Sequence, residues 1–98
     1  MEVYDPSADR WERRAPKPTA VANAGAVEVD GLIYVPGGLD AAQAVRDILE
    51  VYDPRADSWG SAAPLPKPLC AYAIAPWNQG FYLLGGWDGE HYLDTVYY

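Results

Sequence analysis

The residue types that most often carry out chemistry are scarce in this chain of 98 residues. It has one histidine, His91, and one cysteine, Cys70. Nucleophilic catalysis needs a nucleophile held against a base, and a transition-metal site needs several His or Cys ligands. His91 lies in the polar segment GEHYLD, and Cys70 lies in the apolar run LCAYAIA, which is typical of a buried thiol. The sequence therefore predicts no enzyme, no metal site and no cofactor.

Three acidic residues close to His91 raise the question of calcium binding. Asp88, Glu90 and Asp94 do not have the spacing of a D-x-D-x-D-G calcium loop, so we interpret them as acidic turn residues. The formal net charge of -7 argues against nucleic acid or an anionic membrane as partner, because binding to phosphate needs a basic face. No apolar run approaches the roughly 20 residues that cross a bilayer. No signal-peptide pattern is present either, so we expect a cytoplasmic location.

The chain repeats itself at a shift of 48 residues, with EVYDPSADRW at Glu2 and EVYDPRADSW at Glu50. We align the two copies without a gap, which places Tyr98 on Glu50 and on Glu2. The landmarks that recur are aromatic residues and glycines: Tyr4, Trp11, Tyr34, Gly37 and Gly38 in the first copy, and Tyr52, Trp59, Tyr82, Gly85 and Gly86 in the second. A repeat of this length is typical of stacked supersecondary units.

Each copy is predicted to fold as four short strands. The segment AGAVEVDGLIYVPGG contains a tight hairpin turn at Asp30-Gly31, and its second copy turns at Asn78-Gln79-Gly80. Asp and Pro in each YDP segment predict the turn between the third and fourth strands, since Pro fixes φ and Asp accepts hydrogen bonds from the following amides. Residues 41–49 could be argued as a helix, but the flanking turns favour a loop that runs into a strand. No other segment has a useful helical periodicity.

Taken together, strands that end in Gly-Gly and are followed by VYDP, four residues and Trp resemble the Kelch repeat. The resemblance implies an all-β protein, a β-propeller that most often has six blades, with the first strand of each blade lining the central channel. We expect two blades' worth of repeat in permuted register. Residues 1–18 supply the third and fourth strands of one blade, 19–66 a full blade, and 67–98 the first three strands of another.

The resemblance also implies a ligand-facing side, formed by the loops between second and third strands. These loops are residues 39–46 and 87–93. The candidate partner-binding residues are Asp40, Gln43, Trp87, Asp88, His91 and Tyr92. Trp87 and Tyr92 have an alternative role, in packing on a neighbouring blade. Many Kelch repeats carry an Arg where this chain has Val21 and Leu69, which argues against a cationic pocket for acidic peptides.

An arc of two blades leaves apolar faces and strand edges open to water, and this predicts association. We expect a head-to-tail homotrimer with six blades that acts as a scaffold for protein binding, with another protein or peptide as a further partner. Two or four chains, giving four or eight blades, are alternatives. A different reading is that the chain is a trimmed or engineered piece of a larger Kelch propeller with a carbohydrate-binding or enzymatic function.

Overall fold

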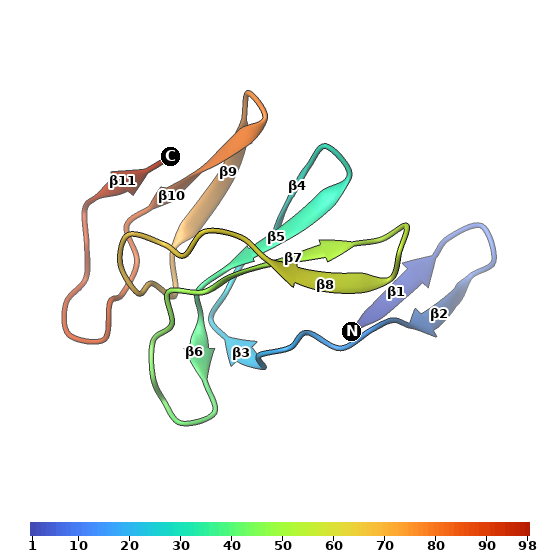
Figure 1. The fold of residues 1–98 in the computed structure, drawn as a ribbon, viewed down its shortest axis with the longest axis horizontal. Helices are drawn as coiled ribbons and strands as arrows, with labels where there is room; N and C mark the ends of the chain where they lie inside the picture. Colours follow the sequence, from blue (N-terminus) through green and yellow to red (C-terminus); the bar gives the residue numbers. More distant parts are fainter.

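The structure is a computed structural model that describes residues 1–98. It contains eleven short strands, β1 to β11, and no helix (Figure 1). Every pair of neighbouring strands is antiparallel, so the predicted all-β class is confirmed. Accordingly, no helix long and apolar enough to span a membrane is found.

The central sheet has four strands in the order β4-β5-β7-β8. The strands are β4 (Val27–Val29), β5 (Leu32–Pro36), β7 (Leu49–Asp53) and β8 (Ser58–Ser61). The predicted hairpin turn joins β4 to β5, and its two residues, Asp30 and Gly31, have φ values of 53° and 82°. Positive φ at both positions matches the right-handed twist of the flanking strands, which explains the choice of Asp-Gly.

The second sheet has three strands in the order β11-β10-β9. The strands are β9 (Ala73–Trp77), β10 (Gly80–Leu84) and β11 (Val96–Tyr97). Asn78 and Gln79 form the two-residue loop between β9 and β10, with φ values of 53° and 66°. The sequence predicts Gly80 in this turn as well, but Gly80 pairs with Trp77 and begins β10.

The remaining strands form two smaller pairs. The hairpin of β1 (Glu2–Asp5) and β2 (Arg10–Arg13) is a sheet of its own. In Figure 1 it lies at the right, away from the β9-β10-β11 sheet and joined to the rest by an extended segment. A short pair of β3 (Val21–Ala22) and β6 (Leu39–Asp40), which the sequence did not predict, closes the base of the long loop after β5.

The two larger sheets pack on each other through the residues of their inner strands. The rings of Tyr34 on β5 and Phe81 on β10 lie 5.6 Å apart. Leu65, Leu69 and Leu83 form the buried core cluster beside them, and Leu69 is completely buried. The segment that links the sheets thus supplies two of the three core leucines.

The Gly-Gly pairs lie where neighbouring backbone is too close for a side chain. Gly37 and Gly38 are buried and have φ values of 55° and 107°. A Cβ on Gly37 would collide with the Leu69 carbonyl oxygen, and one on Gly38 would lie 2.7 Å from the Cβ of Val21. Close neighbours and positive φ therefore explain why glycine occupies both positions.

Replacing Gly37 by alanine is expected to lower the free energy of unfolding by about 2–3 kcal/mol, because the new Cβ meets backbone and φ is positive. Urea denaturation measures the change. Gly60→Ala is the matched control, since nothing lies within 4 Å of the Cβ that it would add. A loss at Gly37 no larger than that at Gly60 contradicts this explanation of the Gly-Gly pair.

The gap-free alignment is wrong at the end of the chain. Gly37 N donates to Ile48 O, whereas Gly85 N donates to Thr95 O, and Leu49 pairs with Pro36 where Val96 pairs with Leu84. The reason is a shorter turn, since Asp40 N bonds to Ala44 O but Asp88 N bonds to His91 O. Tyr97 therefore takes the place of Glu50, and Tyr98 the place of Val51.

Candidate interaction surfaces

The first long loop after a Gly-Gly pair is held by the side chain of Asp40. Its carboxylate accepts hydrogen bonds from the backbone N–H of Ala42 at 2.9 Å and of Ala44 at 3.0 Å, and from the guanidinium of Arg46 at 3.2 Å. The bond from Ala44 does most to lower the pKa of Asp40 below its ordinary value, and the interaction with Arg46 adds to it. Gln43 is exposed at the tip of this loop with φ of 66°.

Asp88 has the same role in the second loop. Its carboxylate accepts the backbone N–H of His91 at 2.7 Å and of Glu90 at 2.8 Å, and it pairs with the Lys67 ammonium at 3.0 Å. The bonds from His91 and Glu90 are the main causes that hold the pKa of Asp88 far below its usual range. The His91 side chain is exposed, and only its backbone takes part in this network.

The loops meet at a small apolar cavity beside Cys70. The Trp87 and Tyr92 rings pack 4.8 Å apart, and Tyr92 is 85% exposed. The cavity has a volume of about 230 Å³ and is lined by Asn23, Leu39, Cys70, Ala71, Trp87 and Tyr92. Of the six candidate residues, two are turn caps, two form this aromatic pair, and Gln43 and His91 point into solvent. Their role in partner binding stays a prediction.

The chemistry available at this cavity is limited. Burial raises the pKa of the Cys70 thiol, which keeps it protonated at neutral pH and unreactive. No group of three or more His, Cys, Asp or Glu side chains is arranged to hold a metal ion.

A second set of contacts is centred on Tyr52, which is only 2% exposed. Its hydroxyl donates to Asp57 at 2.7 Å, and its ring lies 5.1 Å from that of Trp59. The Trp59 indole N–H donates to the carbonyl of Ala15 at 2.9 Å, and the Ala15 N–H donates to Asp57 at 2.9 Å. This Tyr–Asp–Trp group thus attaches the β7-β8 hairpin to the segment that follows β2.

The β1-β2 hairpin carries the same group, already formed but facing water. Tyr4 donates to Asp9 at 2.5 Å, and its ring lies 5.2 Å from that of Trp11. Tyr4 is 42% exposed and Trp11 is 66% exposed. We call residues 2–13 the free hairpin.

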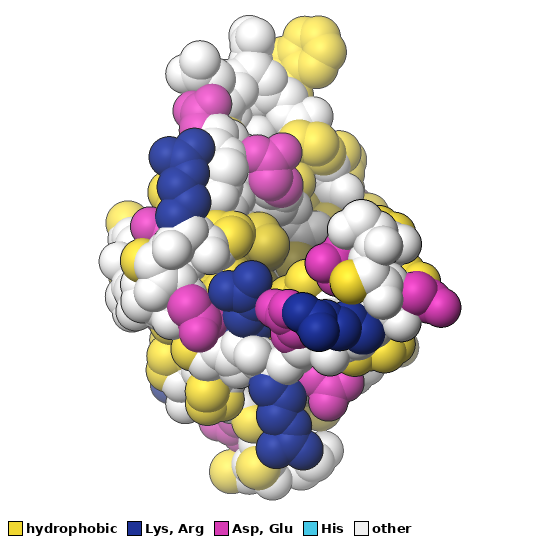
Figure 2. Space-filling view, turned by 90° about the vertical axis from the view of Figure 1, so that its right-hand side faces the viewer, with side chains coloured by type: hydrophobic (Ala, Val, Ile, Leu, Met, Phe, Trp, Pro, Cys, Tyr) yellow, Lys and Arg dark blue, Asp and Glu magenta, His cyan; other side chains and the backbone are white.

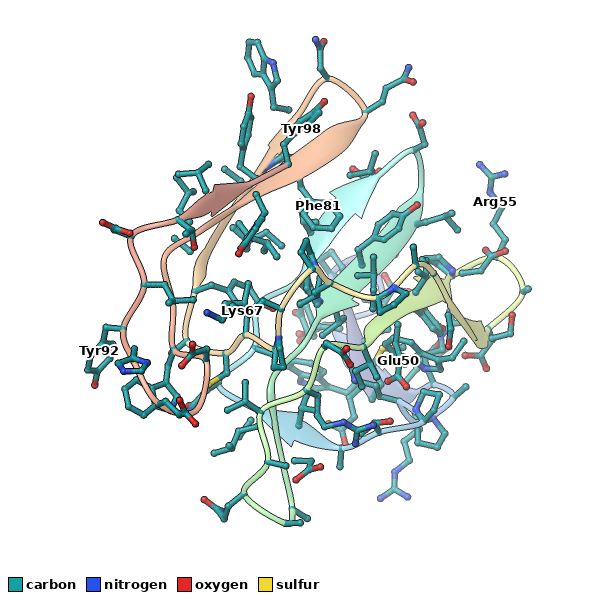
Figure 3. All side chains as sticks on the ribbon, turned by 60° about the vertical axis from the view of Figure 1, so that its left-hand side comes forward. Glu50, Arg55, Lys67, Phe81, Tyr92 and Tyr98 are labelled. Carbon is teal, nitrogen blue, oxygen red and sulfur yellow. The ribbon has the colours of Figure 1, made fainter.

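An apolar groove lies next to β10 at the position that corresponds to the seat of Tyr52. It has a volume of about 270 Å³ and is lined by Leu49, Ala63, Pro64, Leu65, Pro66, Gly80, Phe81, Leu83, Tyr97 and Tyr98. Ala63 is the repeat counterpart of Ala15, the residue that Trp59 and Asp57 bind. Figure 3 shows Phe81 and Tyr98 on the β9-β10-β11 sheet, with Tyr92 far from them at the outer loop. We call this feature the β10 groove.

A buried ion pair joins the segment after the free hairpin to the central sheet. The Lys17 ammonium lies 2.6 Å from a carboxylate oxygen of Glu50, whose side chain is 7% exposed. Thr19 donates its N–H and its hydroxyl to the same carboxylate at 3.3 and 3.0 Å. Burial alone would raise the pKa of Glu50, but the hydrogen bonds from Lys17 and Thr19 outweigh it, and the pKa is lowered.

Sequence reasoning missed this ion pair and the roles of Asp9, Asp57 and Ala15. A signal for the pair exists in the corrected repeat alignment. The counterparts of Lys17 and Glu50 are Leu65 and Tyr97, both of which line the β10 groove. A pair of charges in one copy is thus matched by a pair of apolar residues in the other, and such a joint change is typical of two positions in contact.

Charge on the side of the molecule that carries the free hairpin is mixed. Lys and Arg side chains lie among Asp and Glu there rather than gathering in a region of one sign (Figure 2). Salt bridges from Glu12 to Arg10 and Arg14 belong to this side, at 3.6 and 3.7 Å. The exposed apolar side chains of the free hairpin, rather than a patch of one charge, therefore distinguish this side of the molecule.

The comparisons with known proteins agree with this architecture. The model of the Kelch motif matches residues 20–66. A solved structure titled "Structure of YjhT" has a similar fold, with a TM-score of 0.69 and 23% sequence identity over 79% of this chain. This chain covers 24% of the length of that one. Residues 20–66 therefore match a Kelch repeat, as the sequence predicted, and the chain shares the fold of that solved structure.

Proposed function

We propose that this polypeptide is a propeller building block that associates head to tail, as three copies, into a closed ring of six blades. The observation that carries the proposal is the complementarity of its two open surfaces. The free hairpin exposes a preformed Tyr–Asp–Trp group, and the β10 groove is an unfilled copy of the seat that such a group occupies at Tyr52. A heterologous contact of this kind closes into a ring when the rotation per copy divides the circle.

The number three follows from the family rather than from the contact itself. Kelch propellers most often have six blades, and each copy contributes two repeat lengths. Rings of two or four copies would have four or eight blades, which propellers also adopt. Sedimentation velocity across a concentration series separates these sizes from each other and from a single chain of 10.7 kDa.

The ring would act as a scaffold for protein binding, not as an enzyme. Loops on a rigid β framework are the usual place for recognition, and in the ring the cavity between Leu39 and Trp87 would be present three times. Its aromatic rim of Trp87 and Tyr92 has the composition of a contact surface.

Replacing Tyr92 by alanine is expected to weaken binding of a protein or peptide partner at least about tenfold while leaving assembly unchanged, because its ring is 85% exposed and lies outside the β10 groove. A peptide library selected on the assembled protein supplies the ligand, and titration calorimetry measures the affinity. Glu90→Ala is the matched control, because Glu90 is exposed in the same loop and is not among the candidate partner-binding residues. Selected peptides that bind the Tyr92 variant as tightly as the wild type would place the recognition surface elsewhere.

A further inference from the structure

The outer edge of β10 is only partly paired. In the central sheet, β7 pairs with β5 from Ile33 to Pro36. In the second sheet, β11 pairs with β10 at Leu83 and Leu84 alone. The part of β10 that precedes Leu83 therefore has no strand beside it on this edge, and an unpaired edge is a template for a further strand. The side chain of Tyr98 lies over it, with its ring 4.7 Å from that of Tyr82 and its hydroxyl donating to the Trp77 carbonyl at 3.2 Å.

The free hairpin offers a matching edge. Strand β1 pairs with β2 and with no other strand, whereas its repeat counterpart β7 lies between β5 and β8. The residue types also match, since Tyr4, Asp9 and Trp11 repeat Tyr52, Asp57 and Trp59 in sequence and in side-chain geometry. The contacts of Tyr52 within one chain thus show how the free hairpin of a second copy would bind in the β10 groove.

The shorter turn at Asp88 makes the two copies collide if β1 docks in the register of β7. Tyr97 and Tyr98 take the places of Glu50 and Val51, and Glu2 and Val3 are the counterparts of the same two positions. Val96 and Met1 likewise both correspond to Leu49, so three residues of each chain would compete for one stretch of the shared strand.

Charge decides this competition in favour of Tyr97. A glutamate at the Glu50 position is buried against Lys17 at 2.6 Å. At the β10 groove the counterpart of Lys17 is Leu65, so Glu2 would meet a leucine, and an unpaired buried carboxylate is strongly disfavoured. Tyr97 already packs against the core cluster that contains Leu65, Leu69 and Leu83.

We propose, resting on the head-to-tail assembly above, that the third strand of the shared blade is composite. Residues Val96–Tyr98 of one copy are followed by Tyr4 and Asp5 of the next, and Met1–Val3 is displaced. Tyr4 then lies opposite Phe81, as Tyr52 lies opposite Ile33. The Trp11 indole N–H donates to the carbonyl of Ala63, and the Ala63 N–H donates to Asp9, as Trp59, Ala15 and Asp57 do within one chain.

Displacement of Met1–Val3 breaks only exposed contacts. These are the strand pairs of Glu2 with Arg13 and Val3 with Glu12, and the bond from Arg14 N to Met1 O. A variant that lacks residues 1–3 no longer has to break these contacts. Its dissociation constant for assembly is expected to fall roughly tenfold, the equivalent of one or two exposed hydrogen bonds.

The matched variant shortens the other end. Deleting Val96, Tyr97 and Tyr98 removes the same overlap, but Glu2 must then fill the position next to Leu65, so the dissociation constant is expected to rise at least about tenfold. Adding Leu65→Lys to this deletion places an ammonium beside Glu2 of the next copy, as Lys17 lies beside Glu50, and it is expected to restore assembly. Circular dichroism of each variant checks that it is folded.

Sedimentation equilibrium over a dilution series gives the dissociation constants. The N-terminal deletion is sufficient by itself to test the register of the shared strand, because residues 1–3 are exposed and their loss does not disturb the core. Weaker assembly of this variant, with a wild type that still associates, overturns the composite strand and leaves head-to-tail association standing. A wild type that stays a single chain at every concentration overturns both.

Discussion

Replacing Lys17 by methionine will lower the free energy of unfolding by about 3–5 kcal/mol. The reason is the environment of Glu50, whose carboxylate is 7% exposed and has the Lys17 ammonium at 2.6 Å as its only cationic partner. Methionine keeps the length and the apolar stem of lysine but leaves the carboxylate with hydrogen bonds from Thr19 alone. Urea denaturation at neutral pH measures the loss.

The chain itself provides the control for this prediction. Leu65 and Tyr97 are the counterparts of Lys17 and Glu50, so the double variant Lys17→Leu, Glu50→Tyr copies an arrangement that the fold already contains. Replacing a buried ion pair by apolar residues is often neutral or stabilising. We expect the double variant to come within about 1 kcal/mol of the wild type. A double variant as unstable as Lys17→Met would show that the Lys17–Glu50 contact and its counterpart, Leu65 with Tyr97, are not equivalent.

The same comparison predicts how stability depends on pH. The pKa of Glu50 is lower in the folded chain than its ordinary value of about 4.3. Its contribution to stability is therefore present above that ordinary value and is lost as the pH falls through the folded pKa. The wild type should lose this contribution on acidification and the double variant should not, so the difference between their stabilities should shift in favour of the double variant at acid pH.

Replacing Trp11 by alanine will weaken association about 30-fold or more at each contact, which corresponds to the roughly 2 kcal/mol of an aromatic hot spot. Trp11 is 66% exposed in the single chain, so the folded subunit should keep its stability. Trp59→Ala removes the counterpart within the chain and should instead destabilise the subunit, because Trp59 bonds to Ala15 and packs on Tyr52.

Trp77→Ala separates loss of a specific contact from loss of aromatic surface. Trp77 is 62% exposed, close to the value for Trp11, but it lies at the tip of the β9-β10 hairpin and does not line the β10 groove. Sedimentation velocity and thermal unfolding of the three variants give association and stability together. Equal weakening by Trp11→Ala and Trp77→Ala would mean that the chain associates through unspecific apolar contact.

The sequence is informative wherever backbone geometry restricts the residue type. Asp30-Gly31 and the Gly37-Gly38 pair can be found because few residues tolerate their positive φ or their close neighbours. Asp5 and Asp53 are predicted as turn caps, and each accepts a backbone N–H two residues later at 3.0 Å. Such local rules depend on only a few consecutive residues and can be applied without coordinates.

What the sequence did not predict depends on contacts between distant segments. The Lys17–Glu50 pair joins residues from different elements, and neither residue is unusual by itself. The short β3-β6 pair follows from the path of the loop after Gly38 and has no alternating pattern. The change of register at the C-terminal end was hidden because a loop one residue shorter still closes its turn on an aspartate, Asp88 in place of Asp40.

The mass of the protein in solution tests the central claim most directly. Sedimentation equilibrium of the 98-residue chain at tens of micromolar should give a species with three times the 10.7 kDa of one chain, which dissociates on dilution and on replacement of Trp11. A folded species of 10.7 kDa at all these concentrations would contradict the proposal that the free hairpin of one copy fills the β10 groove of the next.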